Sequence, residues 1–489
     1  MSKKVYAILA LMTILTMAIA ACGPTTAPTT QPQAPAAPAQ PQATAAPAKS
    51  EATEPPPTVT PPALAAGETL IRVWAQANNV EHWRADNTAK AAEMVTDYKL
   101  KVQAVNDSAG WADYKKKFTL AADAGEGPEI VLSGHEDVSV WANAGYIVDF
   151  GPCKDKYPEF NDVIDSLWKS GTWNGKVWAV PQDTEARPMF YNKAMLLKLG
   201  WSQADVDALP DKIKSGEFTL DDMIATAKQA IDKGIVEKGY GYWHRNSKGG
   251  DFLQYYAAYG GRIYDEGQDK LVISKGALLN FYKFQRRVVE EGITPENFIG
   301  TDSNIWHDTV SHGKVLFWNG GVWNWSNWAK NFVQDEGGNE YLFSFIGYAL
   351  QPSGIKGKPG VTLSHPLVYM ITSPKTSGTK LYDQACALLA KTTTTALNTI
   401  HAVESTHLGI LKSQAQDPTY TKDKLLSETL YMLDYNFYQP NHTMYTPWFD
   451  IVYDGMVKAE NGEATPEQAA GDAVKLLQSE IGDYLIVEE

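Results

Sequence analysis

The chain has 489 residues, of which 44% are hydrophobic, and a formal net charge of −14 at pH 7. This length allows two lobes of ordinary size beside a long N-terminal extension. The acidic balance argues against nucleic acid or an anionic lipid surface as a partner, and the scattered acids are typical of an ordinary solvated surface.

The first residues carry the pattern of an export signal. Two lysines precede an apolar run over residues 5–21, which ends in small residues directly before Cys22. This order looks like a bacterial lipobox, so we expect a signal peptide over residues 1–21 and a lipid on the thiol of Cys22. A transmembrane anchor is the alternative, but the run is barely long enough to span a membrane and contains two threonines.

Residues 22–66 consist almost wholly of Pro, Ala, Thr and Gln. Such a composition has too little apolar surface to offset the entropy of ordering, and it predicts a disordered tether. A lipid followed by this tether would hold residues 67–489 away from the extracytoplasmic face of a membrane.

Strands and helices alternate through the rest of the chain. Short β-branched and aromatic runs predict strands, and amphipathic or capped segments predict helices. This alternation indicates an α/β fold with mostly parallel sheets. In chain order the expected elements are strands at 70–74, 129–132 and 177–180, helices after Thr219 and along Phe281–Val288, strands at 315–318 and 368–371, and a helix after Thr465.

Two cysteines remain besides Cys22. Cys153 and Cys386 lie far apart, and an exported protein permits a disulfide between them. Cys386 sits in an apolar helical stretch, where a buried free thiol is the default, so both alternatives stay open. The sequence has no CxxC and no zinc-type spacing, and no metal or cofactor is expected.

Aromatic residues are abundant, with 15 Trp and 24 Tyr beside many acids. Many will lie in the core. Indole faces beside carboxylates and amides are also how proteins bind sugars, because the C–H faces of a pyranose lie flat on a ring while its hydroxyls need rigid polar partners.

Four blocks in order resemble the extracellular solute-binding proteins of ABC importers, in their maltose- and sugar-binding branch. The first is AADAGEGPEI at residues 121–130, and the second is NGKVWAVP at residues 174–181 with YNK at 191–193. The third, GKVLFWNGGVWNWSN at residues 313–327, is followed by the helix after Thr465. The resemblance covers nearly all of residues 67–489.

The resemblance implies the periplasmic-binding-protein type II fold, with two α/β lobes that close around a ligand. Carried over, the N-lobe comprises about residues 67–185 and 368–420, and the C-lobe about 190–364 and 430–489. The hinge crossings would fall within 181–191, 364–369 and 417–435.

The resemblance also implies which side chains contact the ligand. Stacking rings and polar contacts are expected from the loops and hinge: Trp323, Trp325, Trp448 (with Phe449 as its alternative), Asp183, Glu185, Arg187, His135, Glu136, Trp243 and His244. Ser133 stands where the family has a tryptophan, and the segment after Trp74 lacks the acid–lysine pair of the maltose binder, which argues against a maltodextrin ligand.

The expected function is therefore that of a monomeric, lipid-anchored, non-catalytic receptor that binds a carbohydrate and delivers it to the transmembrane subunits of an ABC permease. The same fold with a polyamine, peptide or phosphorylated polyol is the alternative. An extracytoplasmic glycoside hydrolase that uses Asp183 and Glu185 is a third possibility. It has less support, since the hinge match accounts for both acids and the chain contains no GxSxG or HExxH motif.

Overall fold

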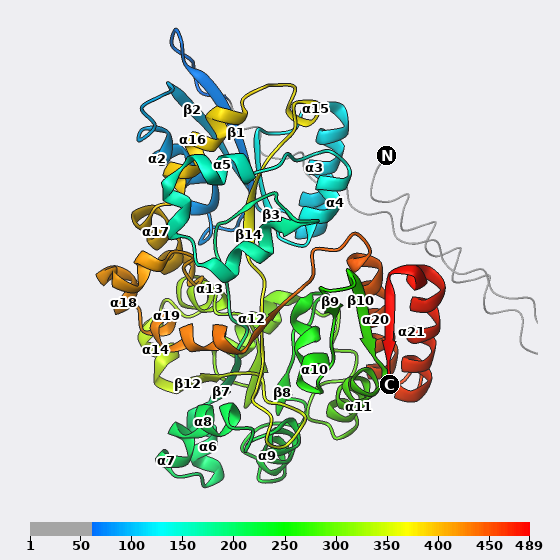
Figure 1. Cartoon of the computed structure of the whole chain (residues 1–489). Coiled ribbons are helices and arrows are strands. Elements are labelled where there is room, and N and C mark those ends of the chain that lie inside the picture. The colour runs from blue at the N-terminus through cyan, green and yellow to red at the C-terminus, as the bar shows by residue number, and fades with distance from the viewer. Residues whose placement is uncertain (1–60) are drawn as a thin grey trace, which may run out of the picture. The chain divides into compact units, whose positions relative to one another are not determined.

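A computed structural model describes residues 61–489, which form two α/β lobes around separate sheets (Figure 1). The expected signal peptide, Cys22 and the tether up to residue 60 lie outside the described residues.

The N-lobe is built on a five-stranded sheet in the order β2-β1-β3-β14-β6. Its strands are β1 (Thr69–Gln76), β2 (Leu100–Asp107), β3 (Ile130–Gly134), β6 (Val180–Pro181) and β14 (Leu367–Ile371). β1 is parallel to β2 and β3, whereas β14 runs antiparallel to β3 and to β6. β3 and β14 are buried along their whole length, as their continuous apolar runs predict for central strands.

Helices cover both faces of this sheet. Ile71 and Val73 face a core cluster that includes Cys386 and Leu388 of α16, while Val131 and Met370 face a second cluster with rings from α3 and α4. The N-lobe helices are α2 (Trp83–Ala92), α3 (Trp111–Ala124), α4 (Asp137–Asn143), α5 (Gly151–Lys156), η1 (Pro158–Asp162), η2 (Asp165–Gly171), α15 (Pro374–Ser377), α16 (Tyr382–Thr392) and α17 (Thr395–Ser405). The hairpin β4 (Thr172–Trp173) and β5 (Lys176–Val177) extends from η2.

The C-lobe contains a four-stranded sheet in the order β12-β7-β11-β8 and a three-stranded sheet in the order β16-β10-β9. Their strands are β7 (Met189–Asn192), β8 (Tyr242–Trp243), β9 (Tyr264–Asp265), β10 (Lys270–Ser274), β11 (Phe317–Asn319), β12 (Ile346–Ala349) and β16 (Leu485–Glu488). In the larger sheet only β8 and β11 are parallel, and β7 runs antiparallel to both of its neighbours.

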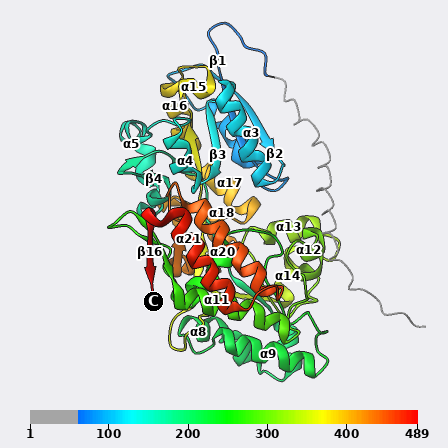
Figure 2. The ribbon, with the colours of Figure 1, turned by 90° about the vertical axis from the view of Figure 1, so that its right-hand side faces the viewer.

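One large core cluster joins the helices of the C-lobe to both sheets. Figure 2 shows α20 and α21 packed beside α11 on one side of this lobe. The helices are α6 (Lys193–Leu199), α7 (Gln203–Asp207), α8 (Leu209–Lys214), α9 (Leu220–Asp232), η3 (Gly250–Phe252), α10 (Leu253–Ala258), α11 (Lys275–Glu290), α12 (Ser303–Ser311), α13 (Asn324–Asn331), α14 (Asn339–Phe345), α18 (Pro418–Lys422), α19 (Lys424–Thr429), η5 (Leu430–Tyr435), α20 (Tyr445–Glu460), α21 (Pro466–Ile481) and η6 (Gly482–Tyr484).

Several stretches of chain meet where the lobes join. Thr184, between β6 and β7, forms a bridge with Leu408, and its hydroxyl lies 2.7 Å from that of Ser364. β13 (Thr362–Ser364) leads directly into β14 and pairs in parallel with β15 (Asn436–Tyr438). Beyond Leu408, η4 (Lys412–Gln416) precedes α18, whose Tyr420 belongs to the C-lobe core. The exact lobe ranges given above stay a prediction.

Most of the expected elements are confirmed. β1 and β14 cover the strands expected at 70–74 and 368–371, β3 begins one residue after the start of the strand expected at 129–132, and β11 begins two residues after the expected 315. The segment 177–180 is instead divided between β5 and β6. The helices α9 and α21 begin with the capping boxes of Thr219 and Thr465, and α11 buries the expected apolar stripe.

The expectation of mostly parallel sheets is wrong. β7 and β14 each enter their sheet from the chain that joins the lobes, without a preceding crossover helix, so they run antiparallel to their neighbours. The question left open for the cysteines is answered by a disulfide between Cys153 of α5 and Cys386 of α16, whose Cα atoms lie 5.5 Å apart. None of the helices within residues 61–489 is long and apolar enough to cross a membrane.

Candidate functional site

A cavity with a volume of about 980 Å³ lies between the two lobes. Its N-lobe wall comprises His135 and parts of residues 166–175, and its C-lobe wall comprises parts of residues 257–269. Residues 436–441, which include β15, complete the lining. The cavity is thus assembled from four stretches that are separated in sequence.

Aromatic and polar side chains alternate around this cavity. Four partly exposed rings line it: Trp173, Tyr264, Phe437 and Tyr438. Amides and charges stand beside them: Gln439, Asn441, Lys169, Arg262, Glu266 and Asp269. Such a wall offers flat apolar faces together with hydrogen-bond donors and acceptors of both charges.

His135, at the end of β3, is the one residue of the expected site that lines the cavity. Its Nδ1 lies 2.9 Å from Oδ1 of Asn441, and the Asn441 amide donates to the carbonyls of Ser170 and Thr172 at 2.7 and 3.0 Å. Burial and the neighbouring His365 lower the pKa of His135 to about 4, so its ring is neutral at physiological pH.

Glu136 follows His135 but does not line the cavity. Its carboxylate pairs with Lys115 and with His365, each at 2.5 Å. Against the effect of burial, these two partners hold its pKa well below the ordinary value. Gly134 permits this arrangement, because a Cβ at that position would collide with the Glu136 carboxylate.

A second part of the expected site lies at the junction of the lobes. Arg187 pairs with Glu185 at 2.5 Å and with Asp251 at 2.7 Å, and its guanidinium lies 4.8 Å from the ring centroid of Trp323. Burial raises the pKa of Glu185 to about 7 despite the opposing charge of Arg187. Both carboxylates conversely raise the pKa of Arg187.

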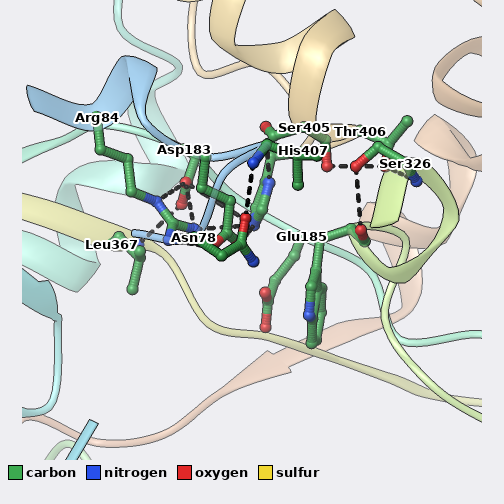
Figure 3. Close-up of polar contacts among 12 residues, drawn as sticks. Asn78, Arg84, Asp183, Glu185, Ser326, Leu367, Ser405, Thr406 and His407 are labelled. Atoms are coloured by element: carbon green, nitrogen blue, oxygen red, sulfur yellow. Dashed lines mark hydrogen bonds and ion pairs between the residues drawn. The ribbon is translucent and has the colours of Figure 1, made fainter. Parts of the chain in front are cut away.

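Asp183 lies deeper, in a buried network with Arg84, His401 and His407 (Figure 3). Arg84 donates to the Asp183 carboxylate at 3.4 Å and to Nε2 of His407 at 3.1 Å. Against the effect of burial, His407 and Arg84 lower the pKa of Asp183, which stays ionised. This network connects α2 of the N-lobe with the segment between β6 and β7 and the segment after α17.

The ring of Trp323 contacts both the ion pairs of Arg187 and the buried network of Asp183. It stacks on His407 at 6.0 Å and lies beneath Arg187. Gly321 leaves room for it, since a Cβ there would collide with the indole. Trp323 is partly exposed, so part of this side chain remains accessible at the junction.

The other expected aromatic residues lie in the C-lobe core. Trp325 is 1% exposed, and its indole N–H donates to Asn339 at 2.9 Å. Trp448 is fully buried against Tyr256 and Tyr445, and Trp243 donates to the carbonyl of Gly239. His244 is also fully buried, with Nε2 3.3 Å from Glu460. The structure does not bring these four to the cavity, and a ligand contact for any of them stays a prediction.

The aromatic lining of the cavity is not among the residues expected from the sequence. Asn174 and Gly175 both have positive φ, at 48° and 70°, as required by the tight turn that joins β4 to β5 and presents Trp173. The Asn-Gly pair was the available signal for this hairpin. The aromatic and amide-rich run over residues 436–441 carried a similar signal for the other wall.

Two groups of side chains have the residue types of a metal site. One comprises His135, Glu136 and His365, and the other comprises Asp183, His401 and His407. In each group the candidate ligand atoms lie within 4.8 Å of one another.

Comparison with protein families gives a match to bacterial extracellular solute-binding proteins over residues 78–390. A curated relative, the diacetylchitobiose binding protein DasA of Streptomyces coelicolor, is 26% identical over 208 residues. That match covers 42% of this chain and 44% of the relative.

Solved structures show the same fold. The GacH receptor of Streptomyces glaucescens, solved unliganded and with acarbose, is 18% identical with a TM-score of 0.69, over 86% of this chain and 100% of that one. Maltose-bound MalE3 of T. maritima is 18% identical with a TM-score of 0.67, over 84% and 99%. The periplasmic-binding-protein fold expected from the sequence is thereby confirmed.

Proposed function

The chain belongs to the bacterial extracellular solute-binding protein family, and from this premise we propose that it binds a carbohydrate between its lobes and delivers it to an ABC permease. The observation that carries the proposal is the inter-lobe cavity, where four aromatic rings alternate with amides and charged groups. Rings of this kind hold the C–H faces of a sugar, and the polar groups between them hold its hydroxyls.

The size of the cavity favours an oligosaccharide. About 980 Å³ is at the upper end of the volumes, roughly 300–1,000 Å³, that small-molecule sites have in proteins. The relative DasA is named for diacetylchitobiose, and the structural neighbours GacH and MalE3 are solved with acarbose and maltose, while another neighbour is solved with α-D-tagatose. These ligands support a carbohydrate as the ligand class here.

Recognition would work through the junction of the lobes. A ligand that touches both walls of the cavity stabilises the closed arrangement by its differential affinity for that arrangement. We propose that Glu185, Arg187 and Trp323 sense this closure, because they lie where chain segments from both lobes meet.

Lipid anchoring and delivery are part of the proposal. Cys22 would carry the lipid, and residues 22–66 would tether the receptor beside its permease on the extracytoplasmic face of the membrane. Feeding cells a clickable fatty acid should label the wild-type chain and leave Cys22→Ser unlabelled. Labelling of both forms would contradict the assignment of the lipid to Cys22.

We assign no hydrolytic reaction to Asp183 and Glu185. Asp183 is held by Arg84 and His401, and Glu185 is held by Arg187. Neither carboxylate lines the cavity, whereas hydrolysis requires two acids on either side of the scissile bond.

A ligand screen on the full chain tests the proposal. Thermal unfolding is followed with mono- and oligosaccharides, polyols, sugar phosphates, polyamines and short peptides, and each hit is then titrated calorimetrically. A ligand at 100 times its Kd stabilises the folded state by about 2.7 kcal/mol, which the assay detects. Stabilisation by sugars alone supports the carbohydrate receptor, and stabilisation only by polyamines, peptides or phosphates would overturn it.

Matched tryptophan variants locate the site. Trp173→Ala removes an indole from the cavity and should weaken sugar binding at least about fivefold, since a stacked ring contributes about 1 kcal/mol or more. Trp111→Ala removes an indole that is 36% exposed on α3, away from the cavity, and should leave the affinity unchanged. Equal effects of the two changes would mean that the sugar binds elsewhere.

A further inference from the structure

The Nε2 atom of His135 is buried and has no hydrogen-bond partner among residues 61–489. The side chain itself is 1% exposed, on the wall of the inter-lobe cavity. A buried polar atom without a partner costs free energy, so its retention in a folded protein requires a physical reason.

The hydrogen bonds around His135 determine which of its two ring nitrogens carries a proton. Both amide hydrogens of Asn441 are used by the carbonyls of Ser170 and Thr172, which fixes the Asn441 oxygen toward the ring. That oxygen can only accept, so Nδ1 of His135 carries the proton. In a neutral imidazole Nε2 is then a bare lone pair, the form in which histidine binds a metal ion.

Two further candidate ligand side chains lie near His135. His365 and Glu136 each offer an atom such that all three candidate ligand atoms lie within 4.8 Å of one another. Nε2 of His365 and Oε2 of Glu136 are 2.5 Å apart, while Lys115 contacts the other carboxylate oxygen. One carboxylate oxygen therefore faces the histidines, and Lys115 is also neutralised by Asp137 at 2.9 Å.

We propose that His135, His365 and Glu136 form a binding site for a divalent transition-metal ion of the zinc class. Two imidazoles and one carboxylate are an established ligand set for Zn²⁺, with a fourth position left for water or another group. Bonds of about 2.0 Å to a tetrahedral ion place its ligand atoms about 3.3 Å from one another, so Nε2 of His365 and Oε2 of Glu136 must move apart from 2.5 Å when the ion binds. The ion replaces the proton shared by His365 and Glu136, which leaves to solvent.

The second histidine group, formed by Asp183, His401 and His407, differs from the first because it already contains a cation. Between Asp183, His401 and His407 the guanidinium of Arg84 already contacts both the carboxylate and Nε2 of His407. An internal cation thus occupies the place that a metal ion would need. Around His135 the described residues supply no such donor to Nε2.

The position of the site gives the ion a role at the hinge. His365 lies between β13 and β14, where the chain passes from one lobe to the other, and His135 lines the cavity. An ion held by both joins the hinge segment to the cavity wall. This inference does not depend on the identity of the solute.

Zinc titration of the full chain without a polyhistidine tag tests the site. After removal of metal with EDTA, the protein competes for Zn²⁺ with a chromogenic chelator, and Co²⁺ is added separately to record its visible absorption. We expect one equivalent of Zn²⁺ per chain and the intense bands of four-coordinate Co²⁺. A wild-type chain that takes up no stoichiometric Zn²⁺ overturns the proposal.

Four variants identify the ligands. His135→Gln and His365→Gln keep polar side chains and should each weaken binding more than about 100-fold, and Asn441→Ala, which removes the partner that orients His135, about 10- to 100-fold. His401→Gln alters the other histidine group and should leave the affinity unchanged. Far-UV circular dichroism of the metal-free variants reports folding, and zinc binding that survives loss of either His135 or His365 overturns the assignment.

Discussion

The guanidinium of Arg187 lies 4.8 Å from the ring centroid of Trp323, so that a buried cation rests on an indole where the lobes join. The same guanidinium pairs with Glu185 and Asp251, which places one positive charge between two buried carboxylates. Removing Arg187 leaves both carboxylates buried without their charge partner, whereas removing one carboxylate leaves Arg187 paired with the other.

Arg187→Ala should destabilise the protein strongly at pH 8. Glu185 and Asp251 would remain buried without a cation, and breaking a buried ion pair from one side costs about 3–5 kcal/mol. Urea unfolding followed by tryptophan fluorescence gives the free energy of unfolding. The control Lys275→Ala breaks an exposed pair with Glu489 and should cost at most about 1 kcal/mol. A loss of similar size in both variants would contradict the role of Arg187.

The stability of the wild type should fall between about pH 4.5 and pH 7 relative to that of Glu185→Gln. The folded-state pKa of Glu185 is raised from 4.5 to about 7, so the folded state binds a proton more tightly than the unfolded state. This stabilisation is complete below pH 4.5 and is lost as the pH rises through 7, with a limit of about 3 kcal/mol. Parallel stability profiles for the two proteins over pH 4–8 would show that Glu185 titrates normally.

Reduction of the disulfide should lower the stability of the N-lobe. Cys153 and Cys386 are 233 residues apart, and a cross-link over a long loop stabilises a protein by constraining its unfolded chain. Replacing both cysteines with alanine should cost about 2–5 kcal/mol. The observable is a lower thermal midpoint, which a reductant should reproduce in the wild type and should not change further in the double variant. An unchanged midpoint in the double variant would exclude a stabilising disulfide.

The ion pair at the cavity should affect ligand affinity only slightly. Lys169 of the N-lobe and Glu266 of the C-lobe both line the cavity and lie 3.2 Å apart, with largely exposed side chains. Glu266→Gln removes an attraction between the lobes and should weaken ligand binding by no more than about fivefold, because an exposed pair contributes at most about 1 kcal/mol. Calorimetric titration at low and high salt should show this difference at low salt only.

A comparable pair within one lobe is the control for this prediction. Lys156 and Asp383 lie 3.5 Å apart on the N-lobe surface, so Asp383→Asn should leave ligand affinity unchanged at either salt concentration. A loss much larger than fivefold in Glu266→Gln would instead mean that Glu266 contacts the ligand directly.

Local patterns in the sequence were sufficient for much of the fold. The apolar runs that became β3 and β14, and the capping boxes of Thr219 and Thr465, depend on neighbours within a few residues. The direction in which a strand runs within its sheet does not depend on neighbouring residues alone. β7 and β14 run antiparallel because of where the chain enters each sheet, and no pattern within either strand encodes that entry.

The candidate site was only partly predictable for the same reason. Trp323 and Trp325 are two positions apart in one motif, yet Trp323 is partly exposed at the junction of the lobes and Trp325 is 1% exposed. The indole N–H of Trp325 is bonded to Asn339, and its ring packs on Phe343, so packing with α14 determines its burial. The spacing of the two tryptophans in the sequence could not predict which of them would be buried.

The sequence by itself determined the family resemblance, the element types and the residues expected at the hinge, since these depend on short segments and their order. The tertiary structure alone decided that Trp173, Tyr264 and Tyr438 share a cavity, and that His135 meets His365. Those contacts join segments up to 265 residues apart in the sequence. The burial and charge of a side chain depend on everything packed around it, and only the folded chain brings those neighbours together.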